Sequence, residues 1–265
     1  MDLHLAGKSV IVTGGGSNIG RAIVHGFARE RAHVTIAEID EAQGEKVAAE
    51  ARAQGAASAV VVGTDVTSWE SVTALVREVE ARRGGVDVLV NNVGWTLDAP
   101  FIEKRREDWE REIQLNLWAA INCTRAVLDG MIARKSGAIV SLGSDAGRVG
   151  QFGEAVYGAC KAGIIALSKS LASEVGKHNI RLNVVCPGMT MPDDDSEISP
   201  RSMWTADVNR RWRTDELRER IAKSYPLRRV GRADDAVAAV LYFASDVSGF
   251  VTGQTLSVSG GYSMV

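Results

Sequence analysis

The feature that most constrains the fold is a regular alternation of short β-branched runs with longer amphipathic segments. The Val- and Ile-rich runs stand at residues 9–14, 33–38, 58–66, 86–92, 137–143, 180–188 and 254–260. Strands that are apolar along nearly their whole length are typical of a parallel sheet covered on both faces. The pattern therefore predicts an α/β fold of the Rossmann type, with a doubly wound, parallel, seven-stranded sheet and helices on both faces.

Helix-like segments separate these runs, at residues 19–31, 41–54, 68–83, 107–134, 154–177 and 233–244. The chain has no internal repeat, low-complexity tract or Pro/Gly-rich linker, so residues 1–265 predict a single domain. One polar segment, 189–224, has no strand pattern. Long connections of this kind in compact domains are commonly functional, so we expect it to be an insertion that covers the substrate.

The composition excludes several classes of partner. The formal net charge is -2, with 24% charged residues, which gives no reason to expect nucleic acid or an anionic membrane as a partner. No apolar run reaches the ~20 residues that span a bilayer. The chain starts with a strand-like run rather than the charged region and long apolar region of a signal peptide, so we expect a cytoplasmic protein. The partner that we expect is a small-molecule substrate.

Cysteine and histidine usage predicts neither disulfides nor a metal site. Cys123, Cys160 and Cys186 lie far apart in mostly apolar segments, which is typical of free buried thiols in a reducing compartment. The four histidines have no metal-ligand spacing, so we expect no bound metal.

The first strand-like run leads into a glycine-rich turn, TGGGSNIGRAI, over residues 13–23. Glycine lets the backbone turn sharply and approach a phosphate with no Cβ in the way. The helix that follows offers free N–H groups and a positive dipole end to a pyrophosphate. A glycine cluster alone could be a bare structural turn, but its place at the first strand-to-helix turn of an alternating pattern predicts a dinucleotide site.

An acidic residue ends the second strand, in AEID at residues 37–40. A carboxylate at this point accepts hydrogen bonds from the adenosine ribose and repels a 2′-phosphate. Glu38 is the first candidate and Asp40 the second, the alternative being a solvated acidic turn. Residues 37–45 hold no Lys or Arg to neutralise a phosphate, although Arg21 could do so. The sequence therefore favours NAD(H) over NADP.

Tyr157 and Lys161 stand four residues apart in the helix-like stretch AVYGACKAG. Positions i and i+4 share one helical face, so the ammonium lies beside the phenol. The pair either packs with its polar ends in water or does proton chemistry, because a nearby positive charge lowers the pKa of a tyrosine from its usual ~10.

Four motifs follow one another along the chain: TGxxx(G)xG at 13–20, NNxG at 91–94, a serine thirteen residues before YxxxK at Ser144, Tyr157 and Lys161, and PG at 187–188. Together they resemble the classical short-chain dehydrogenase/reductase (SDR) family, from the first strand to residues 251–262. One position departs from the pattern, because the usual middle glycine is Asn18. Asparagine tolerates a positive φ, so we expect the turn to form.

The resemblance implies an NAD-dependent oxidoreductase that interconverts a secondary alcohol and a ketone. Tyr157 is the implied general acid/base, and Lys161 lowers its pKa and binds the nicotinamide ribose. Ser144 orients the substrate oxygen, and Asn116 supports a proton relay. The implied cofactor contacts also include Gly14, Ser17, Asn18, Ile19, Gly20, Asp65, Val66, Asn92, Gly94, Pro187, Gly188 and Thr190. Asn92 has the alternative role of bracing the fourth strand.

Substrate contacts are expected from Ser144, Trp95, Phe152, Met189, Trp204 and Trp212. Two substrate classes fit: a bulky alicyclic or aromatic alcohol, or a hydroxyacyl-CoA ester whose phosphates bind the arginines at positions 201, 210, 211 and 213. The alternatives are a 3-oxoacyl thioester reductase and a non-catalytic cofactor-binding partner subunit. The resemblance further implies a homotetramer, with a dimer as second choice.

Overall fold

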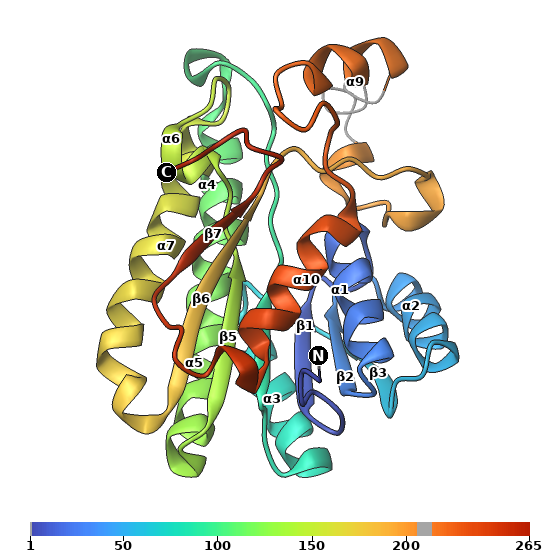
Figure 1. The fold of residues 1–265 in the computed structure, drawn as a ribbon, viewed down its shortest axis with the longest axis vertical. Coiled ribbons are helices and arrows are strands. Elements are labelled where there is room, and N and C mark those ends of the chain that lie inside the picture. The colour runs from blue at the N-terminus through green and yellow to red at the C-terminus, as the bar shows by residue number, and fades with distance from the viewer. Residues whose placement is uncertain (1, 206–213) are drawn as a thin grey trace.

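The computed structural model describes residues 2–205 and 214–265. Its strands form one parallel sheet in the order β3-β2-β1-β4-β5-β6-β7 (Figure 1). The strands are β1 (Ser9–Thr13), β2 (His33–Glu38), β3 (Ser58–Gly63), β4 (Val88–Asn91), β5 (Gly137–Leu142), β6 (Ile180–Pro187) and β7 (Thr255–Val258). The strand order reverses between β1 and β4, which opens a crevice at the carboxyl ends of these strands. The predicted fold class is confirmed.

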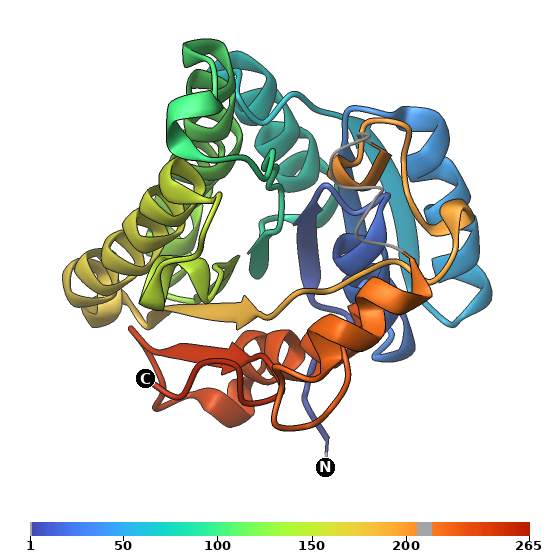
Figure 2. The same cartoon turned by 90° about the horizontal axis from the view of Figure 1, so that it is seen from above.

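Helices cover both faces of the sheet (Figure 2). They are α1 (Asn18–Arg29), α2 (Glu41–Ala53), α3 (Trp69–Arg83), α4 (Arg106–Ile113), α5 (Ala119–Arg134), α6 (Ala146–Val149), α7 (Ala155–Val175), α9 (Asp215–Ala222) and α10 (Ala233–Ala244). Because side chains alternate along a strand, Val10 and Val12 of β1 join the core under α1 and α10, whereas Ile11 joins the core under α3 and α5. Both cores contain side chains of β1 and β4, the two strands between which the crevice opens.

The helix expected over residues 107–134 is divided in the structure. A π-helical segment, Gln114–Trp118, separates α4 from α5. Short π-helical insertions widen a helix by one residue and often occur at functional sites. This one contains Asn116.

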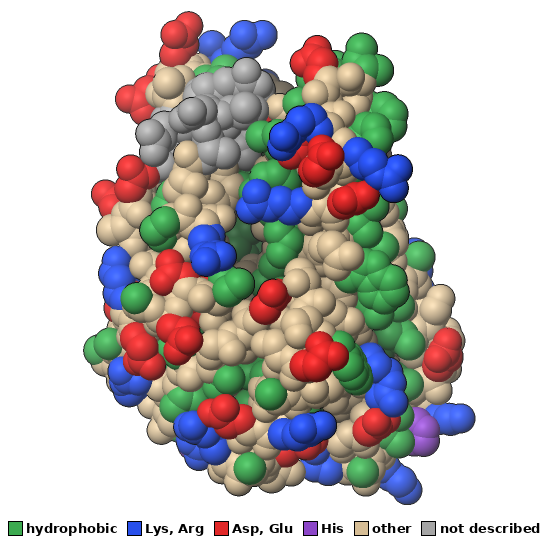
Figure 3. Space-filling view, turned by 180° about the vertical axis from the view of Figure 1, so that it is seen from behind, with side chains coloured by type: hydrophobic (Ala, Val, Ile, Leu, Met, Phe, Trp, Pro, Cys, Tyr) green, Lys and Arg blue, Asp and Glu red, His purple; other side chains and the backbone are tan. Residues whose placement is uncertain are grey.

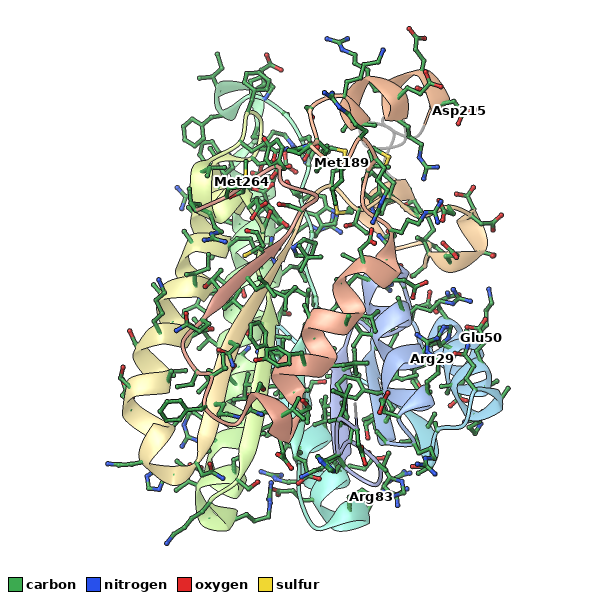
Figure 4. All side chains as sticks on the ribbon, viewed as in Figure 1. Arg29, Glu50, Arg83, Met189, Asp215 and Met264 are labelled. Carbon is green, nitrogen blue, oxygen red and sulfur yellow. The ribbon has the colours of Figure 1, made fainter. Side chains whose placement is uncertain are left out.

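The described parts of the segment 189–224, residues 189–205 and 214–224, lie above the carboxyl ends of the strands. Helix α9, which starts at Asp215, stands at the top, and Met189 begins the segment (Figure 4). Met191, Ile198 and Trp204 form a small apolar cluster within it. It also contains two short 3₁₀ turns, Asp195–Glu197 and Met203–Thr205. Trp212 and the arginines at 210, 211 and 213 lie outside the described residues.

The surface and the thiols agree with the composition. Basic and acidic side chains are interspersed on the face in Figure 3, without a large area of one sign. Cys123, Cys160 and Cys186 are free and buried, as predicted. Within residues 2–205 and 214–265, no helix has the length and apolar character needed to cross a bilayer.

Candidate active site

One cavity of about 680 Å³ runs along the carboxyl ends of the strands. Its lining begins at Gly14 and Glu38, passes Ser144 and Tyr157, and continues to Trp204 in the segment above. The crevice predicted from the strand order therefore joins the glycine turn to the Tyr157 region in one space.

The glycine turn has the backbone that a close approach requires. Gly14 and Asn18 both have positive φ, 61° and 44°, so asparagine does take the conformation expected of it. A Cβ on Gly20 would collide with the carbonyl oxygen of Gly14 and the side chain of Asn92. Gly14, Ser17, Asn18 and Ile19 line the cavity. The first-turn N–H groups of α1 lack intrahelical acceptors, so this cradle fits a dinucleotide pyrophosphate.

Glu38 is buried at the end of β2 and lines the cavity. Its Oε2 accepts a hydrogen bond from Gly16 N at 3.0 Å, and its Oε1 accepts one from Ile39 N at 2.9 Å. These bonds fix a negative charge beside the turn. Asp40 caps α2 by accepting from Gln43 N at 3.2 Å, and it is not part of the lining.

Arg21 does not face this carboxylate as a free cation. Its Nε donates to Glu50 Oε2 at 2.9 Å, and its Nη1 lies 3.6 Å from Glu197 Oε1. Arg21, the nearby cation that the sequence offered to a 2′-phosphate, is thus already paired with two carboxylates.

The other expected cofactor residues lie along the same wall. Asp65, Val66, Asn92, Gly94, Pro187, Gly188 and Thr190 all line the cavity. Asn92 Nδ2 donates to the carbonyl oxygens of Thr13 and Gly14 at 3.0 and 3.1 Å, so it also braces β4 against β1. A Cβ on Gly94 would lie 3.2 Å from Lys161 Nζ, which keeps this position small.

Ser144, Tyr157 and Lys161 come together at the middle of the cavity. Ser144 follows β5, and the other two lie on α7. Lys161 is buried, its Nζ donates to Leu142 O at 2.8 Å, and it lies 5.5 Å from the centre of the Tyr157 ring. A hydroxyl, a phenol and an ammonium therefore converge on one space.

Burial shifts Tyr157 and Lys161 toward their neutral forms. It raises the pKa of Tyr157, with nearby Glu154 acting in the same direction and a hydrogen bond with Ser144 opposing it. It lowers the pKa of Lys161 to about 8. The lowered Tyr157 pKa expected from the sequence is therefore wrong for the protein alone, and it stays a prediction for the enzyme with oxidised cofactor bound.

Asn116 has a different geometry from the one expected. Its side chain is 1% exposed and does not line the cavity. Oδ1 accepts from Trp95 N at 3.1 Å, and Nδ2 donates to Trp95 O at 2.7 Å and Glu112 O at 2.8 Å. These bonds fix the backbone of Trp95, the residue that follows the NNVG motif. The proton-relay role stays a prediction.

The substrate end of the cavity is only partly the one expected. Trp95, Met189 and Trp204 line it. Phe152 was wrongly expected as a wall, because its side chain is 87% exposed on the turn before α7.

Sequence reasoning missed Thr96, Asp98, Arg111, Gln151, Glu154, Tyr225 and Tyr262, all of which line the cavity. Arg111 stacks over Trp95 at 4.0 Å. Glu154 could have been predicted as a lining residue from its position one helical turn before Tyr157.

The segment after β6 also covers the cofactor turn. Ser199 N donates to Ser17 Oγ at 3.2 Å, and Ser199 Oγ donates to Asp40 Oδ2 at 3.0 Å. Lys46 Nζ donates to Ser196 O at 2.7 Å. The segment expected to cover the substrate therefore also contacts the glycine turn and α2. Its role as a substrate cover stays a prediction.

Comparisons with known proteins find relatives over nearly the whole chain. The family model described as enoyl-(acyl carrier protein) reductase matches residues 14–263. The 3-oxoacyl-[acyl-carrier-protein] reductase FabG of Chlamydia muridarum is 37% identical over 261 residues, covering 98% of this chain and 99% of the relative. The protein of the same name from Staphylococcus aureus strain Mu50 is 35% identical over 258 residues, covering 97% and 98%.

Solved structures are similar over nearly the full length. A putative short-chain alcohol dehydrogenase from Sinorhizobium meliloti 1021 superposes with a TM-score of 0.87 at 29% identity, covering 99% of this chain and 98% of that one. The structure of gox2181 gives a TM-score of 0.87 at 32% identity, covering 98% and 97%.

Proposed function

The chain belongs to the short-chain dehydrogenase/reductase family, whose members use a nicotinamide cofactor, and we propose that it is an NAD(H)-dependent reductase of 3-oxoacyl thioesters. One observation supports catalysis most directly. Ser144, Tyr157 and Lys161 line the same cavity as the glycine cradle of Gly14 and Asn18. A non-catalytic partner subunit would not need this assembled trio.

Tyr157 is the proposed proton donor to the substrate oxygen. A bound nicotinamide cofactor supplies the hydride that adds to the carbonyl carbon in the reductive direction. Burial keeps Tyr157 protonated in the protein alone, which suits an acid that gives its proton to the oxygen as the hydride arrives. In the reverse direction the phenolate takes the proton back.

Ser144 and Lys161 assist Tyr157. The Ser144 hydroxyl donates to the substrate oxygen and stabilises the negative charge that develops there. Lys161, held by the Leu142 carbonyl, places positive charge near the phenol and stabilises the phenolate formed when the proton leaves.

The preference for NAD(H) rests on Glu38. Its carboxylate is fixed by the N–H groups of Gly16 and Ile39, and a fixed anion accepts hydrogen bonds from ribose hydroxyls but repels a 2′-phosphate. The pairing of Arg21 with Glu50 and Glu197 leaves that repulsion in place.

The thioester class is supported by the relatives named 3-oxoacyl-[acyl-carrier-protein] reductase, which match almost the whole chain. This favours the thioester alternative over the bulky simple alcohol. The cavity continues beyond Tyr157 between Trp95, Met189 and Trp204, which gives an acyl group an apolar wall.

The test is NADH oxidation with acetoacetyl-CoA, an acetoacetyl thioester of acyl carrier protein, and cyclohexanone, with NADPH in parallel. We expect kcat/KM to be highest for one of the thioesters with NADH. The two thioesters distinguish the carriers. Turnover of cyclohexanone alone would overturn the thioester assignment, and a preference for NADPH would overturn the cofactor assignment.

A further inference from the structure

Glu154 is a buried carboxyl on the wall of the substrate space. It stands immediately before α7, three residues before Tyr157, and lines the cavity beside that residue. Its side chain is only 8% exposed. None of the roles derived above uses it.

One oxygen of this carboxyl accepts a hydrogen bond from a residue of the turn before α7. Gln151 Nε2 donates to Glu154 Oε1 at 3.2 Å. Buried polar groups almost always have hydrogen-bond partners, so a buried carboxyl on a cavity wall is placed to bond a ligand group in that cavity.

The groups around Glu154 keep it protonated near neutral pH. Burial and the nearby carboxylate of Asp98 raise its pKa to about 8, with Glu112 adding to the rise and Lys104 opposing it. Lys104 is already paired with Glu112 at 2.5 Å. The phenols of Tyr157 and Tyr225 are its other titratable neighbours.

A neutral carboxyl offers an O–H donor that a carboxylate lacks. A 3-oxoacyl thioester has two carbonyl oxygens on carbons separated by one methylene. When the ketone oxygen lies against Tyr157 and Ser144, the thioester oxygen is close by and needs a donor. An acid fixed one helical turn from Tyr157 on the same wall supplies that donor.

We propose that Glu154 binds the thioester carbonyl oxygen of the substrate through its O–H group and thereby selects 1,3-dicarbonyl substrates over simple ketones. This inference rests on the proposed thioester reductase function. Ionisation of Glu154 removes the donor and places an anion against a carbonyl oxygen. Selection for the thioester is therefore lost as the pH rises through the pKa of this group.

The test compares S-acetoacetyl-N-acetylcysteamine with the ketone in which a methylene replaces its thioester carbonyl. The readout is the ratio of the two kcat/KM values with NADH, because effects on Tyr157 and on cofactor binding are common to both substrates. For the wild-type protein we expect the ratio to be constant from pH 6 to 7 and to fall about tenfold between pH 7.5 and 9.5.

Two variants complete the experiment. Glu154→Gln keeps a donor without an ionisable group, so its ratio stays within about threefold of the neutral-pH wild-type value and no longer depends on pH. Glu154→Ala loses the donor, and its ratio falls about 10- to 100-fold, mainly through the KM of the thioester. Equal losses for both substrates, or a wild-type ratio that does not change with pH, would overturn the role of Glu154. Wild-type turnover of the ketone without the thioester would instead overturn the proposed function.

Discussion

Lys161 holds its ammonium 5.5 Å from the centre of the Tyr157 ring while donating a hydrogen bond to the carbonyl oxygen of Leu142 at 2.8 Å. The helix spacing alone brings the two side chains to one face. The bond to Leu142, the last residue of β5, adds a second anchor from a different element. The cation is therefore held in place independently of the phenol.

This independence gives a prediction for Tyr157→Phe. The variant removes only the hydroxyl, so we expect kcat to fall about 10³-fold because the proton donor is gone. The affinity for NADH should stay within about threefold, since the glycine turn and Lys161 are unchanged. Steady-state kinetics and a fluorescence titration with NADH measure the two effects. Wild-type turnover by the variant would show that another group moves the proton.

Glu38→Ala tests the cofactor preference. Loss of the carboxylate removes the repulsion of a 2′-phosphate and the bonds to the ribose, so the ratio of kcat/KM for NADH over NADPH should fall by about tenfold or more. The matched control is Asp40→Asn, which keeps the cap on α2 and should leave the ratio within about twofold. Equal changes in the two variants would mean that the negative charge of the whole turn, and not the Glu38 carboxylate, sets the preference for NADH over NADPH.

The sequence could predict the sheet because each strand is encoded locally by an apolar run. The expected runs contain all seven observed strands. It could not predict the break in 107–134, where Asn116 of the π-helical segment bonds to Trp95, a partner that is distant in sequence. A helical pattern contains no information about such a partner.

The site was predictable where a motif fixes both residue type and spacing, as for Ser144, Tyr157 and Lys161. It was not predictable where tertiary neighbours decide exposure. Phe152, an aromatic residue near Tyr157 in sequence, lies on an exposed turn. Glu154 is an acidic residue type whose pKa rises to about 8 because the fold buries it and brings the charge of Asp98 near it.

Ser199→Ala tests the contact between the segment after β6 and the cofactor turn. The change removes the bond that Ser199 Oγ donates to Asp40 and the bond that it accepts from Arg201 N. The bond to Asp40, which joins the segment to the N-cap of α2, contributes about 1 kcal/mol. If the segment must lift to release cofactor, the dissociation rate constant of NADH should rise about fivefold in stopped-flow displacement. Ser196→Ala is the control, because Ser196 contacts Lys46 through its backbone carbonyl. An unchanged rate in Ser199→Ala would mean that NADH leaves without opening this contact.

Lys104→Met tests the buried ion pair that supports the substrate wall. Lys104 and Glu112 are both almost fully buried, and Glu112 also accepts from Thr96 Oγ1 at 3.1 Å. Removing the cation leaves an uncompensated buried carboxylate, so the free energy of unfolding should fall by about 3–5 kcal/mol in urea titrations at pH 7. The double variant with Glu112→Gln should recover part of that loss. A loss below about 1 kcal/mol would show that the pair is not needed.

Glu154 also predicts how stability depends on pH. Its pKa is raised from 4.5 to about 8, chiefly by burial, so between these values the native protein holds a proton that the unfolded chain has lost. The free energy of unfolding therefore decreases as the pH rises through this window. Glu154→Gln lacks this linkage, so its stability relative to wild type should increase from pH 5 to 8 by on the order of 1 kcal/mol per pH unit. Urea titrations of both proteins at pH 5, 6, 7 and 8 measure the difference. A difference that does not change with pH would mean that Glu154 ionises in the folded protein as it does in water, and that it is not a hydrogen-bond donor at neutral pH.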